Sequence, residues 1–244
     1  MTVEGMYLYC VTEAAGEHLG NIGIAGKEVT GVTYKDVTAI VSPVPFKTID
    51  AGLETIMVHQ KVVEACRARA TTLPVRFGVI FKSKEGVKEM LEKSYSDYRA
   101  KLSKLRGKEE FGAKVIVDEA GLKRIRAEVE NESEVARKLS KAVAKATKGT
   151  SYLLKIKLDE AVRNEAAKRL EAMSQAVHGE LSRAALESVL LKAEHEQIIL
   201  NAAYLVDNSR QGDFQAEAGK VKRKYEKQGL AIHLSGPWAP YSFC

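Results

Sequence analysis

Two polar residues stand inside otherwise apolar segments and are the first candidates for chemistry. His59 begins the segment HQKVVEAC, and Arg76 interrupts the run LPVRFGVIF. An arginine buried in such a run needs a carboxylate or carbonyl partner, because an unpaired buried charge is costly. Glu109 and Glu110, just before the next predicted strand, are the expected partners. We favour a structural ion pair, with binding of an anion or of a small-molecule substrate near His59 and Arg76 as the alternative.

The sequence offers little else for catalysis. The five histidines fall on different predicted elements and form no HxxxH or HExxH motif, so no metal site is expected. P-loop, dinucleotide-binding and GxSxG motifs are absent. Cys66 and Cys10 read as core residues, and Cys244 as an exposed terminal thiol. We therefore predict neither catalytic residues nor a cofactor.

Composition leaves the choice of partner open. The 244 residues are 45% hydrophobic and 29% charged, with a formal net charge of +6. A basic chain can bind nucleic acid, anionic lipid or acidic protein. The N-terminal residues lack the basic start of a signal peptide, and no apolar run approaches the roughly 18 residues of a membrane span. We expect a cytoplasmic protein with reduced cysteines and no membrane partner.

The first 110 residues predict an α+β domain with a small antiparallel sheet. Its strands are predicted over Met6–Val11, Val29–Tyr34 and Val37–Ser42, the last two forming a hairpin, after which Pro43 and Pro45 should end the sheet. A helix over 53–70 has Asp50 as its expected N-cap and an apolar face that includes Leu53, Ile56, Met57, Val63 and Cys66. A second, long helix should run from Ser83 to Gly107.

Residues 111–244 predict a second domain. The expected order is a strand over Phe111–Asp118, a helical region broken at Gly149-Thr150, strands over Ser188–Lys192 and Gln197–Val206, a helix over 212–228 and a strand over Leu230–Leu234. This βαββαβ order is that of a ferredoxin-like domain with an enlarged helical insert. Beyond it, an aromatic tail contains the only tryptophan, and its prolines are expected to prevent strand formation.

Two basic helices raise the alternative of nucleic-acid binding. Lys138, Lys141, Lys145 and Lys148 crowd one, and Lys220, Lys222, Arg223, Lys224 and Lys227 the other. Ferredoxin-like RNA binders stack bases on aromatic residues of their central strands. The strand IILNAAYLV offers only Tyr204. A solvated helix face is therefore favoured, and no nucleic-acid partner is expected.

Several segments together resemble one family across the chain. MYLYCV, VTAIVSPVP, HQKVVEAC, TTLPVRFGVIF, LRGKEEFGAKVIVD, LNAAYLVD and GPWAPYSF occur in the order found in the gas vesicle protein F/L family (GvpF/GvpL). LPVRFG and GPWAPYSF are the most specific of them. The residues singled out by these motifs are His59, Leu73, Pro74, Arg76, Phe77, Gly78, Glu110, Gly112, Gly236, Pro237, Trp238, Pro240 and Tyr241.

The resemblance implies a non-enzymatic accessory protein of gas vesicle formation. It implies a location in the cytoplasm and at the gas vesicle, and as partners the small hydrophobic shell protein (GvpA) and other accessory proteins. A shell subunit whose strands assemble edge to edge can aggregate before incorporation. An accessory protein could hold it by strand pairing or by covering its apolar face, and the N-terminal domain is the expected place. The tail is expected to pack across the domain junction, with partner docking as the alternative.

Overall fold

A computed structural model describes residues 4–13 and 18–244. The chain forms two compact units: the first comprises residues up to Glu110 together with Pro237–Cys244, and the second comprises Phe111–Gly236. Each unit combines helices with an antiparallel sheet, which confirms the predicted mixed α and β composition. The last eight residues group with the first unit, whereas the sequence places them with the C-terminal domain. No helix in the described part of the chain is long and apolar enough to cross a membrane.

The first unit is built on a sheet with the strand order β2-β3-β4-β1-β5, and β6 also pairs with β1. The strands are β1 (Glu4–Thr12), β2 (His18–Gly20), β3 (Val29–Tyr34), β4 (Val37–Pro45), β5 (Thr72–Pro74) and β6 (Ile80–Phe81). The predicted hairpin is confirmed: β3 and β4 are antiparallel and their link places Lys35 at φ 53°. A bulge between Leu8 and Cys10 in β1 keeps Tyr9 and Cys10 in the same core cluster.

The prediction that Pro43 and Pro45 end the sheet is wrong. β4 continues to Pro45, and its two prolines lie opposite Met6 and Glu4 of β1. On its other side, β4 pairs with β3 only as far as Val41. Residues beyond Val41 therefore have a strand on one side alone. A proline that lacks its N–H can be accommodated at such a locally unpaired edge.

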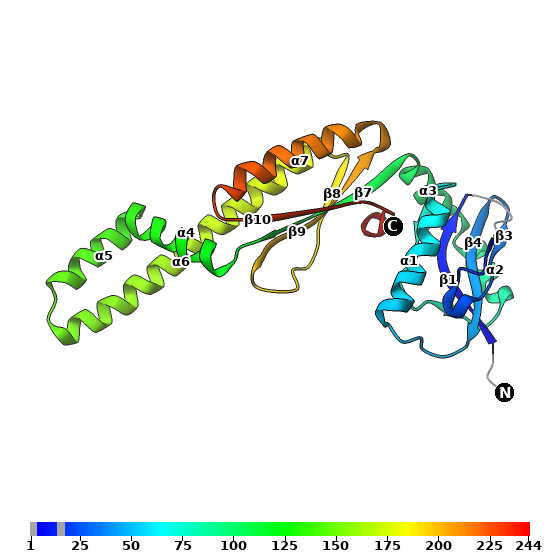
Figure 1. Ribbon diagram of the computed structural model, residues 1–244, viewed down its shortest axis with the longest axis horizontal. Helices are drawn as coiled ribbons and strands as arrows, with labels where there is room; N and C mark the ends of the chain where they lie inside the picture. The colour runs from blue at the N-terminus through cyan, green and yellow to red at the C-terminus, as the bar shows by residue number, and fades with distance from the viewer. Residues whose placement is uncertain (1–3, 14–17) are drawn as a thin grey trace. The chain divides into compact units, whose positions relative to one another are not determined.

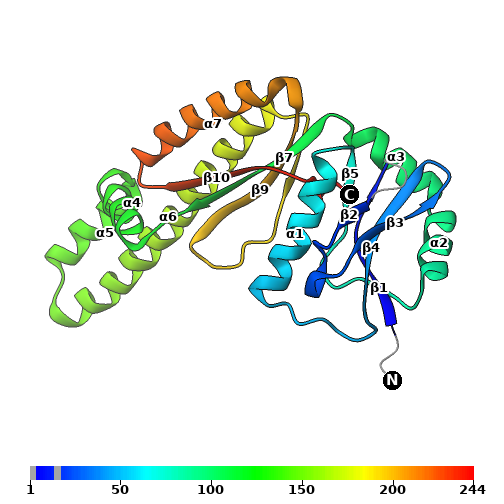
Figure 2. The same ribbon diagram turned by 45° about the vertical axis from the view of Figure 1, so that its right-hand side comes forward.

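Helices cover both faces of this sheet (Figures 1 and 2). α1 (Leu53–Arg67) packs on one face, and α2 (Lys84–Lys93) and α3 (Tyr95–Leu105) pack on the other. The single long helix that was predicted is thus two, separated at Ser94. Ser83, where the long helix was predicted to begin, caps α2 and accepts a hydrogen bond from the Gly86 N–H. Asp50 does not cap α1: the N-cap is Gly52, and the Thr55 hydroxyl donates instead to the carbonyls of Asp50 and Gly52.

The second unit has a sheet of β7 (Lys108–Ile116), β8 (Glu187–Leu190), β9 (Ile198–Asp207) and β10 (Ala231–Trp238), in the order β10-β7-β9-β8. β10 continues through Gly236 and Pro237 to Trp238, so the prediction that these residues cannot extend a strand is wrong. Since β10 is an edge strand, a proline need not remove a ladder hydrogen bond. Gly236 adopts φ 110°, a conformation that favours glycine.

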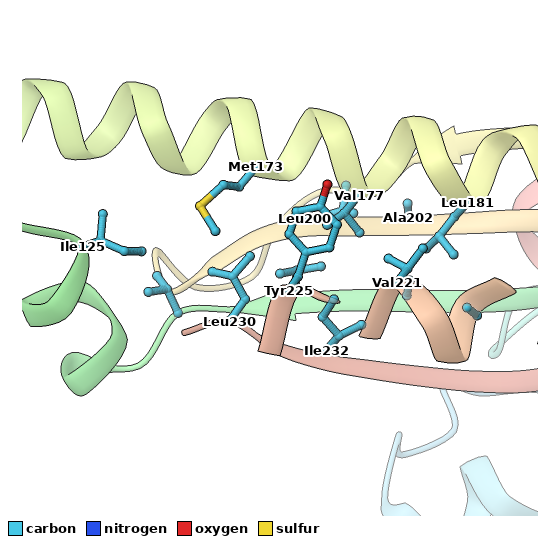
Figure 3. Packing of buried hydrophobic residues seen from close by; sticks show 14 of the residues in the cluster. Ile125, Met173, Val177, Leu181, Leu200, Ala202, Val221, Tyr225, Leu230 and Ile232 are labelled. Carbon is cyan, nitrogen blue, oxygen red and sulfur yellow. The ribbon is translucent and has the colours of Figure 1, made fainter. Parts of the chain in front are cut away.

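The helices of the second unit are α4 (Glu119–Glu132), α5 (Glu134–Lys145), α6 (Lys148–Ala184) and α7 (Gln211–Glu226). The predicted break at Gly149-Thr150 is wrong, because α6 runs through both residues and the chain turns just before them. α6 and α7 pack on one face of the sheet (Figure 3). Met173, Val177 and Leu181 of α6 meet alternate residues of β7 and β9 there, as a half-buried antiparallel sheet requires.

Candidate functional site

The segment Leu73–Gly78 wraps along one edge of β1. Leu73 and Pro74 are buried in β5, opposite Val11 and Cys10. The chain then turns and returns to the same strand as β6, opposite Met6 and Tyr7. Gly78 adopts φ 94° in this turn, where a side chain would strain the backbone. The apolar run LPVRFGVIF is therefore two short strands joined by a turn that glycine makes possible.

His59 lies beneath this turn, on the core-facing side of α1. Its side chain is 4% exposed and contacts the rings of Tyr7, Tyr9 and Phe77, with centroids 5.6–5.8 Å from its own. The Tyr7 hydroxyl lies 2.9 Å from His59 Nδ1 and accepts a hydrogen bond from the Gly78 N–H. A histidine, a tyrosine and the turn are thus joined in one buried network. The alternation of Tyr7 and Tyr9 in MYLYCV signals that both face this core.

The ionisation state of this network follows from its burial. The Tyr7 hydroxyl accepts from the Gly78 N–H and lies within hydrogen-bond distance of His59 Nδ1, and His59 Nε2 is buried with no hydrogen-bond partner among the described residues. Burial lowers the pKa of His59, with the backbone of Val75 opposing the change. Burial also raises the pKa of Tyr7 to about 12. Both groups are therefore neutral near pH 7, and the cluster fixes the turn to the core.

Arg76 does not form the predicted ion pair with Glu109 or Glu110. Its side chain is exposed, and it forms no ion pair among the described residues. Arg67, at the end of α1, takes the expected place: its guanidinium lies 2.6 Å from both Glu64 and Glu109. Arg76 is exposed because it lies on the outer side of the turn. The next residue, Phe77, faces the core. The sequence signal for Arg67 was Glu64 three residues earlier on the same helix.

Glu110 instead binds the C-terminal tail. Its two carboxylate oxygens accept hydrogen bonds of 2.8 Å from the backbone N–H and the hydroxyl of Ser242. Burial raises the pKa of Glu110, opposed by these two donors. Sequence reasoning missed Ser242, because nothing in GPWAPYSF marks its serine as a partner for a residue 132 positions away. Because Glu110 and Ser242 both belong to the first unit, the contact fixes the tail within that unit.

The remaining motif residues divide between burial and exposure. Ala239 and Pro240 are buried, and Tyr241 packs against the core cluster that includes Tyr7 and Tyr9. Trp238 is 43% exposed. Cys244 donates its thiol to the Pro240 carbonyl at 2.9 Å. In the second unit, a Cβ added to Gly112 would lie 2.7 Å from Ser235 Oγ, so a larger residue there would force the Ser235 side chain to move. These residues serve close packing, and no group of metal-ligating side chains occurs among the described residues.

Comparison with known proteins assigns the family. The sequence profile described as "Gas vesicle synthesis protein GvpL/GvpF" matches residues 5–244. The chain therefore belongs to the GvpL/GvpF family, which supports an accessory role in gas vesicles.

Two relatives match along more than nine-tenths of their length. Gas vesicle protein L of Streptomyces sp. (strain CB03234) is 28% identical, covering 97% of this chain and 91% of the relative. Gas vesicle protein F of Haloferax mediterranei is 26% identical, with coverages of 98% and 93%. The crystal structure of GvpF from Anabaena sp. PCC7120 has the same fold, with a TM-score of 0.83 at 24% identity over 98% of both chains.

Proposed function

We propose that this protein is a non-enzymatic assembly factor that binds the small hydrophobic shell protein (GvpA) and other accessory proteins. By covering apolar surface of the shell protein during nucleation, it limits aggregation before incorporation. It acts in the cytoplasm and at the gas vesicle. The observation that carries this proposal is the family match from residue 5 to residue 244.

The second unit is proposed to be a ferredoxin-like domain. The element order from β7 to β10 is βαββαβ if α4, α5 and α6 are taken as one enlarged crossover. The sheet order β10-β7-β9-β8 places its first and third strands in the centre. We further propose that the chain folds as two domains that meet at residues 110 and 111, and that the aromatic tail has a structural role. Removing the residues after Ser235 should then lower the thermal midpoint, because it deletes Ser242, whose backbone N–H and hydroxyl both donate to Glu110.

The first unit offers an apolar surface in preference to a strand edge. The strands β2, β5 and β6 are only two or three residues long, so they provide little backbone for a partner strand. In contrast, three apolar side chains stand exposed at the start of α1: Leu53 at 77%, Ile56 at 43% and Met57 at 62%. They lie on the apolar face predicted for this helix, yet the core covers only its second half. We therefore place the shell-protein contact at the start of α1.

A hollow beside this helix start extends the same surface. It has a volume of about 300 Å³ and lies between the turn Ile24–Lys27 and the segment Pro43–Asp50. Pro43, Val44 and Pro45 in its wall belong to the part of β4 that has a strand on one side only. Apolar side chains of a partner could enter this hollow while its backbone lies over α1. The surface thus suits a hydrophobic polypeptide more than a nucleic acid.

Co-expression with the shell protein tests the proposal. The chain should co-purify with the shell protein and reduce the light scattering that the shell protein develops alone. The triple variant Leu53→Ser, Ile56→Ser, Met57→Ser should lose both effects while keeping its thermal midpoint. The matched control replaces Leu186 and Leu190, exposed apolar residues of the second unit, with serine. Loss of capture in the control, with capture intact in the triple variant, would place the contact elsewhere.

A further inference from the structure

The charge of the chain is concentrated in one helical hairpin. From Val135 to Leu158 there is no acidic residue, and the seven basic ones are Arg137, Lys138, Lys141, Lys145, Lys148, Lys155 and Lys157. Since the formal net charge of the whole chain is +6, all other residues together carry a net charge of −1. α5 and the first turns of α6 form this hairpin, and they lie side by side beyond the end of the sheet of their unit (Figures 1 and 2).

The first turns of α6 carry apolar residues on two opposite sides. Leu154 and Leu158 are partly buried on the side that packs against the neighbouring helices. Tyr152, Leu153 and Ile156 are 68%, 61% and 50% exposed. At 3.6 residues per turn, these three point away from Leu154 and Leu158. An apolar stripe therefore runs along the outer side of α6 with nothing of the described chain covering it.

Lysines border this outer stripe on both sides. At the same helical spacing, Lys148 and Lys155 lie along one border, and Lys157 lies along the other. None of the three forms an ion pair among the described residues. On α5, by contrast, Lys138, Lys141 and Lys145 occupy the side opposite to its partly buried residues and face away from α6. The stripe thus has its own flanking charges, separate from those of α5.

We propose that the outer stripe of α6, formed by Tyr152, Leu153 and Ile156, binds an amphipathic helix of a partner protein whose apolar face is flanked by acidic residues. Apolar side chains three and four positions apart on such a helix would cover the stripe, and carboxylates on its two borders would meet the lysines. This surface lies in the second unit and goes beyond the shell-protein contact proposed for the first.

The charge pattern selects this occupant over others. A second copy of the same hairpin would bring seven more basic residues and only Glu134 as an acidic one, so self-association through this surface is opposed by repulsion. A flat anionic membrane against the stripe would meet the three lysines of α6 while those of α5 point away. A helix with two acidic borders satisfies the stripe and both of its lysine borders at once.

A binding experiment with two designed helical peptides tests the proposal on the full chain. Both carry leucines at alternating spacings of three and four; one has glutamates along both borders, and the other has lysines. Fluorescence anisotropy should show binding of the glutamate peptide only, weakening as salt is added. Tyr152→Ser with Ile156→Ser should weaken binding by about tenfold or more, as truncation at the centre of an interface does. Leu190→Ser, at a site 63% exposed in the same unit, is the matched control.

Charge reversal provides the decisive comparison. Replacing Lys148, Lys155 and Lys157 with glutamate should exchange the preference, so that the lysine peptide binds and the glutamate peptide does not. The same reversal at Lys138, Lys141 and Lys145 changes the net charge equally and should leave the preference as it is. Circular dichroism verifies that each variant keeps its helix content.

Three results would overturn the proposal: equal effects of the two reversals, binding of neither peptide, or preferential binding to phosphatidylserine-containing vesicles through Tyr152 and Ile156.

Discussion

α1 and α6 begin in the same way and differ in what surrounds their exposed ends. Each starts with apolar residues that face outward, and each buries its later turns in the core of its own unit: Val62, Val63 and Cys66 in α1, and Met173, Val177 and Leu181 in α6. Around the start of α1, the acidic residues Asp50 and Glu54 lie near Lys27 and Lys47 of the neighbouring hollow, whereas the charged residues of α6 from Lys148 to Leu158 are all lysines. The two exposed apolar surfaces that we propose as docking sites thus differ in the charge around them, which is why we propose different partners for them.

The buried halves of the two helices share a further device. His59 of α1 is hydrogen-bonded to Tyr7, and His178 of α6 lies with its Nδ1 3.0 Å from the Tyr204 hydroxyl. In both cases the tyrosine is fully buried in a central strand of the sheet. Burial lowers the pKa of both histidines, but His178 is only half-buried. Comparing the two pairs therefore tests how burial changes the stabilisation that the same contact provides.

The largest expected effect separates the two ends of α6. Leu181→Ala should destabilise the protein by about 2–5 kcal/mol, because it leaves a cavity in a fully buried position. Leu153→Ala removes the same atoms from an exposed position and should change stability by no more than about 0.5 kcal/mol. Urea unfolding of both variants measures the difference. A comparable loss in Leu153→Ala would mean that the outer stripe is covered in the free protein.

Periodicity located the helices but could not say which of their apolar residues are covered. Leu53, Ile56 and Met57 have the spacing of core residues, and the structure leaves them exposed. The break at Ser94 was missed because apolar spacing continues across it, and the break predicted at Gly149-Thr150 lies a few residues earlier, at Ala146 and Thr147. The longer strands of both sheets, including the β3–β4 hairpin, were predicted, whereas β2, β5 and β6, which are only two or three residues long, were not.

The next expected effect compares the two histidines. His59→Ala should cost about 1–3 kcal/mol, because it leaves the buried Tyr7 hydroxyl without an acceptor. His178→Ala should cost less, since His178 is itself half-buried and water can reach the space it vacates beside Tyr204 more easily. A double-mutant cycle with Tyr7→Phe isolates the pair. His59→Ala should cost less in the Tyr7→Phe background, where the hydroxyl is already gone, and the difference is the coupling energy. Equal costs for the two histidines would mean that enclosure does not set the value of the contact.

A smaller effect distinguishes the arginines at the end of α1 and in the following turn. Arg67→Ala should cost about 1 kcal/mol, because it removes the partner that Glu64 and Glu109 share. Arg76→Ala should be neutral within about 0.5 kcal/mol in thermal unfolding. If Arg76→Ala nevertheless impairs shell-protein capture, Arg76 belongs to a binding surface. A stability loss at Arg76 as large as that at Arg67 would contradict its exposed position.

The candidate site shows what a single sequence can reveal. His59, Phe77 and Gly78 were singled out by their motifs, and the structure brings them together. The partners were not predictable: Arg67 replaces Arg76 as the ion-pair residue, and Ser242 replaces the arginine expected for Glu110. Which of two arginines nine residues apart reaches a carboxylate depends on the direction of one turn. That direction is set by Gly78 and Phe77 within the folded unit, and local spacing does not encode it.

The smallest expected effect is a difference in pH dependence between His59 and His178. A folded-state pKa below the unfolded value of about 6.5 means that the unfolded chain binds the proton first. Stability should therefore be complete above about pH 6.5 and fall as the pH is lowered toward the folded-state pKa.

Replacing His59 with glutamine should remove more of this dependence than the same change at His178, because His59 is more deeply buried. Urea unfolding between about pH 5 and pH 8 measures it, with a maximum slope of about 1.4 kcal/mol per pH unit for one proton. The raised pKa of Glu110 gives a slope of opposite sign, since there the folded state holds the proton. That contribution is common to both variants and cancels in their difference. A steeper loss at His178 would show that its pair with Tyr204 is the more enclosed of the two.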